Sequence, residues 1–313
     1  MTNASLATAY ESGPRRSRTR PLTGGARAAT FAIMCAVRNA ISPDAESPYQ
    51  VRAVTRALDV LVAFGSLSAP VDLATLARHV GLHPTTTFRY LESLKARGFV
   101  QHRDGGYELG SPVFDLASTY LRGLSVWSHA QGLADRLAAT ANETASLGVL
   151  DHGQVLYIAI ANGQRELGIQ SSPGTRHPAH CTALGKAMLS ALAWPEVEAT
   201  LAAHPAVRLT TRTLVEPDAL MADLAAVRTR GYAVDDEERV PGVICIGVPI
   251  RDHSGGVVAA ISISGPAFRI QEQGIHAMAG LVIAAAADAS ARLGADGTSR
   301  PVRDPATPSR ATR

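Results

Sequence analysis

The chain has 313 residues, of which 46% are apolar and 18% are charged. This length and apolar content allow about two domains of roughly 150 residues with buried cores, and they argue against a disordered or fibrous protein. The formal net charge of +3 is too small to indicate a nucleic-acid partner by itself.

The cysteines and the hydropathy pattern bear on the compartment. None of Cys35, Cys181 and Cys245 belongs to a CxxC pair, which favours a reducing cytoplasm and argues against a zinc ribbon. No apolar run reaches the roughly 18 residues that a membrane helix needs. We therefore expect a cytoplasmic protein without a membrane partner, a metal or a cofactor.

Both ends of the chain have the composition of irregular segments. Residues 1–49 mix Ser, Thr, Gly and Pro with several arginines and show no sustained period, which predicts a disordered basic arm. Such an arm can contact DNA phosphates. Alternatively, it can be a flexible N-terminus without a function, or the result of a wrongly assigned start codon. The tail, residues 294–313, is rich in proline and small residues and is also predicted to be disordered.

Residues 50–110 carry three helical patterns in chain order. The first is an amphipathic stripe that ends at Gly65 and consists of Val51, Val54, Leu58, Leu61 and Val62. Asp72 can cap a second helix that ends at Gly81, and Pro84 can occupy the first position of a third. Two short helices joined by a tight glycine turn are typical of a helix-turn-helix.

A wing and a linker helix are predicted next. Two β-prone runs, residues 99–100 and 107–109, flank Asp104-Gly105-Gly106, which allows the positive φ angles of a tight hairpin. Residues 111–124 then form a helical pattern with a broad apolar face made of Val113, Leu116, Ala117, Tyr120, Leu121 and Leu124. A helix with that much apolar surface usually pairs with a second copy, so we expect a linker and dimerisation helix.

Residues 125–293 alternate strands and helices. The strand candidates are residues 146–150, 155–160, 167–171, 232–235, 243–250 and 257–264. The helix candidates are residues 126–141, 182–192, 195–203, 217–230 and 271–293. Adjacent strands joined by hairpins, with helices grouped between and after them, predict an α+β domain around an antiparallel sheet.

The third helical pattern predicts a DNA-reading face. Its inner stripe is Thr87, Tyr90, Leu91 and Leu94. The outer face then carries Thr85, Thr86 and Arg89, whose hydroxyl, methyl and guanidinium groups can contact phosphates and base edges in the major groove. Arg103 at the wing tip is placed to lie along a neighbouring backbone or minor groove. A trihelical protein-interaction module is the alternative.

Two segments of the second stretch could bind a ligand. A Pro/Gly loop leads into a helix in which the small residues Ala183 and Gly185 would allow a ligand to approach the backbone closely. Free amides at the start of a helix attract anions. Many helices begin in this way without binding anything, and Lys186 could be solvated or paired internally. Four consecutive acids at residues 235–238 repel one another and need solvent or a bound group. Cys245 could line a pocket or fill the core.

Catalysis and metal binding have weak support. His180 is adjacent to Cys181, but sequence neighbours do not in general form a base and thiol pair, and there is no nucleophile-elbow motif. No ligand spacing supports a metal site at His180, Cys181, Asp235 and Cys245. We expect no catalytic or metal residues, and a thiol-dependent enzyme remains an alternative.

The motifs together resemble the IclR-type bacterial transcriptional regulators. The resemblance covers about residues 49–270 and rests on several motifs in one order: Gly81-Leu82-x-x-Thr85-Thr86-x-x-Arg89-Tyr90-Leu91, Arg97-Gly98-Phe99-Val100, His180-x-Thr182-Ala183-x-Gly185-Lys186-Ala187, Gly231-Tyr232-x-x-Asp235-x-Glu237-Glu238, Gly242-x-x-Cys245-x-Gly247-x-Pro249 and Ile261-Ser262-Ile263-Ser264-Gly265-Pro266. Pro84 departs from the family, in which a basic or polar residue is common at that position, so one DNA contact and the sequence preference are in question.

The resemblance implies an N-terminal winged helix-turn-helix (50–110), a linker helix (111–124) and a C-terminal GAF-like α/β effector-binding domain (125–293). It implies a sequence-specific regulator, a homodimer or homotetramer, that binds double-stranded operator DNA and is controlled by a small organic acid. The implied DNA-reading positions are Thr85, Thr86 and Arg89. The implied effector pocket consists of Ala183, Leu184, Asp235, Val243, Cys245, and Ser262 or Ser264.

Overall fold

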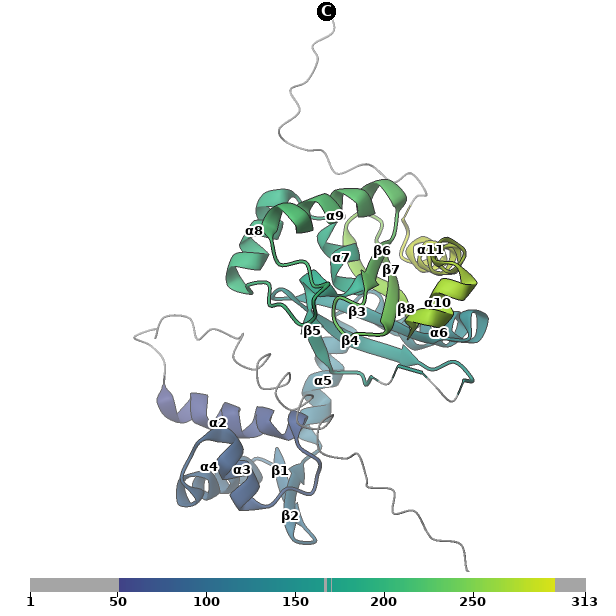
Figure 1. Cartoon of the computed structure of the whole chain (residues 1–313). Coiled ribbons are helices and arrows are strands. Elements are labelled where there is room, and N and C mark those ends of the chain that lie inside the picture. The colour runs from purple at the N-terminus through teal and green to yellow at the C-terminus, as the bar shows by residue number, and fades with distance from the viewer. Residues whose placement is uncertain (1–50, 166–167, 170, 296–313) are drawn as a thin grey trace, which may run out of the picture. The chain divides into compact units, whose positions relative to one another are not determined.

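The computed structural model describes residues 51–165, 168–169 and 171–295. The arm predicted for residues 1–49, and the predicted tail beyond residue 295, lie outside the described residues. The N-terminal elements in Figure 1 are α2 (Arg52–Ala63), η1 (Phe64–Ser66), α3 (Leu73–Val80), α4 (Pro84–Ala96), β1 (Val100–Arg103), β2 (Gly106–Leu109) and α5 (Pro112–Arg122).

Local signals determine where α3 and α4 begin and end. Asp72 precedes α3, and its Oδ1 accepts a hydrogen bond from the Thr75 amide at 2.9 Å, which is the usual N-cap arrangement. Gly81 ends α3 with a φ of 67°, a left-handed conformation that glycine adopts without steric cost. Pro84 opens α4, where the missing amide hydrogen costs nothing. The predicted helix-turn-helix is therefore confirmed.

The hairpin after α4 is confirmed as well. β1 and β2 are antiparallel, with Arg103 opposite Gly106. The two turn residues, Asp104 and Gly105, have φ angles of 37° and 91°, as a two-residue hairpin turn requires. The helices and the hairpin share a core that includes Val60, Phe64, Val71, Leu76, Leu91, Val100 and Tyr107.

Two helices of this part present apolar side chains to solvent. The side of α2 that enters the core carries Val60 and Ala63, because the neighbouring helices pack against its C-terminal end. Most of the predicted apolar stripe instead faces outward, with exposures of 53–67% at Val51, Val54, Leu58 and Val62. On α5 the exposures are 49–73% at Phe114, Leu116 and Tyr120.

The C-terminal elements surround one sheet. They are α6 (Trp127–Ala141), β3 (Thr144–Asp151), β4 (Gln154–Ala161), β5 (Arg176–Pro178), η2 (Ala179–Cys181), α7 (Ala183–Leu189), α8 (Trp194–Ala203), α9 (Pro217–Arg230), β6 (Ala233–Asp236), β7 (Val243–Arg251), β8 (Val257–Pro266), α10 (Ala267–Gln273) and α11 (Ile275–Arg292). The strand order is β5-β4-β3-β8-β7-β6, and every neighbouring pair is antiparallel. The predicted α+β arrangement is confirmed, and likeness to GAF domains stays a prediction.

The two faces of the sheet differ in what covers them. α6 and α11 lie on one face (Figure 1), over a core that includes Leu147, Val149, Ile244, Ile246, Ile261 and Ile263. α7 lies on the opposite face and contacts α9 on its far side. The core of this second layer includes Val155, Tyr157, Leu184, Met188, Val197 and Leu224.

Three expectations about this part were wrong in detail. The described residues of segment 167–171 form no strand, and the strand at the sheet edge next to β4 is β5 instead. The helix expected at residues 182–192 ends at Leu189. The last predicted helix is two helices, because Gly274 adopts a φ of 82° and the axes of α10 and α11 meet at 86°. Among the described residues, no single helix is long and apolar enough to cross a membrane. Only α10 and α11 taken together reach that length and apolar composition, and they are bent at Gly274.

Candidate DNA-reading helix and buried polar row

The outer face of α4 carries the predicted DNA-reading residues. Thr85, Thr86 and Arg89 are all exposed, whereas Thr87 and Leu91 have no exposed surface. The N-terminal turn of α4, where residues of a recognition helix reach base edges, is therefore open.

Arg103 lies at the end of β1, beside the hairpin turn. Its Nε is 3.3 Å from Glu108 Oε1, and the arginine side chain is 67% exposed. Exposed pairs of this kind contribute little, about 0–1 kcal/mol. The guanidinium can therefore exchange Glu108 for a phosphate at small cost.

A row of polar side chains lies on the α7 face of the sheet. The strand register places Asp235 of β6 opposite Cys245 of β7, and Cys245 opposite Ser264 of β8. Ser262 lies opposite Gly247 and shares the same face, because side chains alternate along a strand. The four polar side chains are at most 8% exposed. Four predicted effector-site residues therefore lie together.

The start of α7 lies directly against this row. A Cβ on Gly247 would be 2.6 Å from the carbonyl carbon and oxygen of Ala183 and 3.0 Å from the amide nitrogen of Leu184. Glycine is the only residue that permits this approach without a shift of the backbone. Gly185 is still closer to the backbone of η2, since a Cβ there would be 2.2 Å from the carbonyl oxygen of Ala179. Val243, the remaining predicted residue, is half-buried at the first position of β7.

The first turn of α7 is already capped by the chain. Thr182 Oγ1 accepts a hydrogen bond from the Gly185 amide at 3.2 Å, and the Thr182 carbonyl accepts one from the Lys186 amide at 2.9 Å. The expectation of free amides at this helix start is therefore wrong for Gly185, because the side chain before the helix occupies it.

The four consecutive acids are held by specific partners. Asp235 Oδ1 accepts hydrogen bonds from the amides of Glu238 at 2.8 Å and Arg239 at 3.3 Å. Burial raises the pKa of Asp235 above its usual value, although these two amides act in the opposite direction. Asp236 and Glu237 both pair with the exposed Arg212. The expectation that the run needs solvent or a bound group is therefore wrong for the buried Asp235, which protein amides hold, whereas the Asp236 side chain keeps 48% exposure to solvent.

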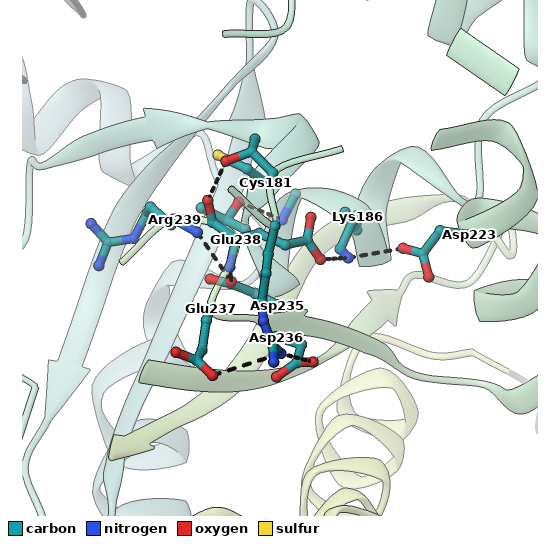
Figure 2. Close-up of polar contacts among 12 residues, drawn as sticks. Cys181, Lys186, Asp223, Asp235, Asp236, Glu237, Glu238 and Arg239 are labelled. Carbon is teal, nitrogen blue, oxygen red and sulfur yellow. Dashed lines mark hydrogen bonds and ion pairs between the residues drawn. The ribbon is translucent and has the colours of Figure 1, made fainter. Parts of the chain in front are cut away.

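Lys186 holds the fourth acid inside the protein. Its side chain is 1% exposed, and its Nζ contacts a carboxylate oxygen of Glu238 and lies 2.8 Å from Asp223 Oδ2 (Figure 2). Burial lowers the pKa of Lys186, but Glu238 and Asp223 outweigh it, and the pKa lies above its usual value. Lys186 is therefore a charged, internally paired lysine and is not solvated.

The two cysteines of the described residues, Cys181 and Cys245, have the environment of structural thiols. Cys181 Sγ donates to the Pro178 carbonyl at 3.8 Å, whereas the His180 ring bonds the Val207 carbonyl at 3.1 Å. Burial raises the pKa of the Cys245 thiol to about 12, and it raises the pKa of Cys181 as well. Neither thiol forms a thiolate near neutral pH, which a nucleophile requires. The described residues contain no group of three or more side chains placed to hold a metal ion.

Sequence reasoning missed three residues near the polar row. The Tyr157 and His177 rings meet edge to face with centroids 5.3 Å apart, and Arg239 lies 3.5 Å from His177, measured from Nη1 to Nε2. The signal for Arg239 in the sequence is weak, because an arginine directly after four acids is expected to form ion pairs with those acids.

Comparison with known proteins identifies the family. Residues 53–104 match the IclR helix-turn-helix domain, and residues 118–291 match the bacterial transcriptional regulator IclR C-terminal domain. The chain belongs to the IclR family of bacterial transcriptional regulators.

Relatives in this family are regulators of transcription and not enzymes. The chain is 35% identical to the HTH-type transcriptional regulator BhcR of Paracoccus denitrificans, over 79% of this chain and 88% of the relative. It is 33% identical to the acetate operon repressor of Salmonella typhimurium, over 78% and 91%. The crystal structure of Thermotoga maritima IclR has 28% identity and a TM-score of 0.65, over 78% of this chain and all of that one (100%).

Proposed function

We propose that this IclR-family regulator binds operator DNA through the outer face of α4 and changes its occupancy when a small organic acid binds at the polar row. The proposal rests on how the side chains of α4 are distributed between solvent and core. Thr85, Thr86 and Arg89 face solvent while Thr87 and Leu91 are fully buried. This orientation supports insertion of the outer face into a major groove, with Arg103 of the wing on the adjacent backbone.

The polar row supports an effector site on the C-terminal sheet. Polar groups are costly to bury, yet Asp235, Cys245, Ser262 and Ser264 lie together on one buried sheet face, where two backbone amides hold Asp235 in place. A small number of fixed polar groups in an otherwise apolar layer is typical of a site that orients a small ligand. The site is proposed to include Ala183, Leu184, Gly185 and Val243, which border the row.

Assembly is the second part of the proposal. The outward apolar stripes of α2 and α5 support a homodimer or a homotetramer, because burial of such stripes stabilises association. The proposed division is a winged helix-turn-helix at 50–110, a linker helix at 111–124 and an effector-binding domain at 125–293. An effector that prefers one arrangement of the paired domains changes the spacing of the two α4 helices. A coupling of about 1–3 kcal/mol is enough for a 5–150-fold change in affinity.

The test is DNA binding by a charge-matched pair of variants. A duplex is first selected from a random pool by the full-length protein, and binding is then measured by fluorescence anisotropy. Arg89→Ala should weaken binding by about 1–3 kcal/mol, or 5–150-fold, if it contacts a base. Arg97→Ala removes the same charge from the opposite end of α4, where Arg97 is exposed, and should have a smaller effect.

Two results would contradict the assignment. Equal losses in the two variants would mean that α4 contributes only net charge and not a reading face. Selection of no duplex, or binding whose affinity is independent of salt concentration, would favour the protein-interaction module, because release of counterions makes DNA binding salt-dependent.

A further inference from the structure

The loop after β6 contains one arginine whose charge has no carboxylate partner in the described part of the chain. The acids before it are engaged elsewhere: Asp236 and Glu237 pair with Arg212, and Glu238 pairs with Lys186. Figure 2 shows the Arg239 guanidinium directed away from these carboxylates. Arg239 is half-buried, so its positive charge is only partly hydrated.

The backbone holds Arg239 in place independently of its side chain. Its amide donates to Asp235 Oδ1 at 3.3 Å. Thr210 and Thr213 anchor the preceding residues, with hydroxyl donors 2.8 Å from the Glu237 carbonyl and 2.6 Å from the Glu238 carbonyl. The guanidinium is therefore presented by a fixed loop, an arrangement that reduces the entropy lost when a ligand binds.

The partner that the guanidinium does have cannot neutralise it. His177 Nε2 lies 3.5 Å from Arg239 Nη1. Burial, with a further contribution from Arg239, lowers the pKa of His177 to about 3, so the imidazole is neutral at physiological pH. Arg239 lies beside the polar row, because its amide nitrogen is 3.3 Å from Asp235 Oδ1. Burial raises the pKa values of Tyr157, Cys245 and Asp235, and the charge of Arg239 opposes that rise.

We propose that Arg239 binds the carboxylate of the effector, and that the effector is a small monocarboxylic acid whose hydroxyl group hydrogen-bonds to Asp235 in the polar row. This inference rests on the proposed function, because it assumes that the polar row is the effector site. A planar guanidinium suits a carboxylate, which it can bind with two parallel hydrogen bonds.

Charge favours a singly charged acid over a phosphate. Arg239 contributes one positive charge. Asp235 contributes a carboxylate nearby, on β6, which is two strands from Ser264 on β8. A dianion would leave one negative charge uncompensated beside Asp235, in an environment where like charges repel strongly. A ligand with one carboxylate for Arg239 and a neutral, hydroxyl-bearing end for Asp235 therefore matches the charges of these two residues.

The experiment measures ligand binding to the full-length protein by thermal shift and calorimetry. The probes are glycolate, lactate, mandelate and 4-hydroxybenzoate, each beside its uncharged amide. Arg239→Gln removes the charge and leaves the backbone amide that Asp235 uses. Arg212→Gln is the matched control, because Arg212 lies near the same loop but pairs with Asp236 at an exposed position. Melting temperatures without ligand verify that both variants fold.

The expected result is stabilisation of the wild type and Arg212→Gln by at least one acid and not by its amide, with binding to Arg239→Gln weakened by about tenfold or more. Equal binding of that acid to both variants would overturn the role of Arg239 while the proposed effector control stands. Binding of the amides as tightly as the acids, or of no probe at all, would overturn the hydroxy-acid class. Loss of DNA binding in Arg89→Ala is measured separately, so failure of the proposed function is distinguishable.

Discussion

Replacement of Lys186 by methionine gives the most direct test of how the C-terminal layers are held together. The side chain lies between Glu238, which is 5% exposed, and Asp223, with its Nζ 2.8 Å from Asp223 Oδ2. Arg230 Nη2 is 3.5 Å from the other oxygen of Asp223. Methionine fills a similar volume, so the substitution removes the charge and leaves Glu238 buried without its cation.

The expected loss of stability is large. Removing one partner of a buried ion pair costs about 3–5 kcal/mol, because the remaining charge is left uncompensated. The same substitution at Lys95 is the control. Lys95 pairs with Glu92 at 2.6 Å, but both side chains are about two-fifths exposed, at 43% and 40%, so Lys95→Met should cost no more than about 1 kcal/mol.

Unfolding in urea measures both effects. Trp127 and Trp194 are the two tryptophans of the chain, so tryptophan fluorescence follows the C-terminal part, and circular dichroism follows the whole protein. The double variant Lys186→Met with Glu238→Gln should recover part of the loss, since it removes the uncompensated carboxylate as well. A loss below about 1 kcal/mol in Lys186→Met would refute the role of the cluster.

The pH dependence adds a second criterion. Burial raises the pKa of Glu238 above its usual value, and Lys186 opposes that rise; without Lys186 the pKa should rise further. Between the unfolded and folded pKa values the folded state of the variant then binds more protons than the unfolded state, so its stability increases as the pH falls. The deficit of Lys186→Met should therefore be smaller at pH 5 than at pH 7, and an equal deficit would contradict the assignment to Glu238.

Two further predictions concern packing and assembly. Gly247→Ala would place a Cβ 2.6 Å from the Ala183 backbone and should destabilise the protein by about 1–3 kcal/mol. In contrast, Gly280→Ala, which meets nothing within 4 Å in α11, should be neutral or stabilising by up to about 1 kcal/mol in urea unfolding. Leu116→Ser on the exposed face of α5 should raise the dimer dissociation constant about tenfold or more in light scattering. Met221→Ser on α9 should leave it unchanged, and equal effects would place the interface elsewhere.

Features that depend on neighbouring residues could be predicted. The cap at Asp72, the turn at Gly81 and the hairpin at Asp104 and Gly105 each involve groups within about four positions, and each formed as expected. Ser262 and Ser264, which the family resemblance gave as alternatives for the pocket, lie on one side of β8, because side chains alternate along a strand. These features are local because backbone geometry determines them directly.

Other features depend on which elements meet. The stripe on α2 has the correct period, but periodicity cannot tell which side meets the neighbouring helices, and Val60 and Ala63 took the inner side. Strand β5 has three residues, too few to show a period of two. Its place at the sheet edge comes from pairing with β4.

The amino-acid order by itself thus determined the helix-turn-helix, the wing, the antiparallel α+β plan and the membership of the IclR family, because each of these is carried by short-range geometry or by contiguous motifs. Only the tertiary structure decided how the charges are shared. Lys186 and Glu238 are 52 residues apart in the chain, and their contact requires α7 and the loop after β6 to meet. Because these elements meet, the acids around Arg239 have other partners, and the Arg239 guanidinium is directed away from them. Three-dimensional packing sets this outcome, and adjacency in the chain does not.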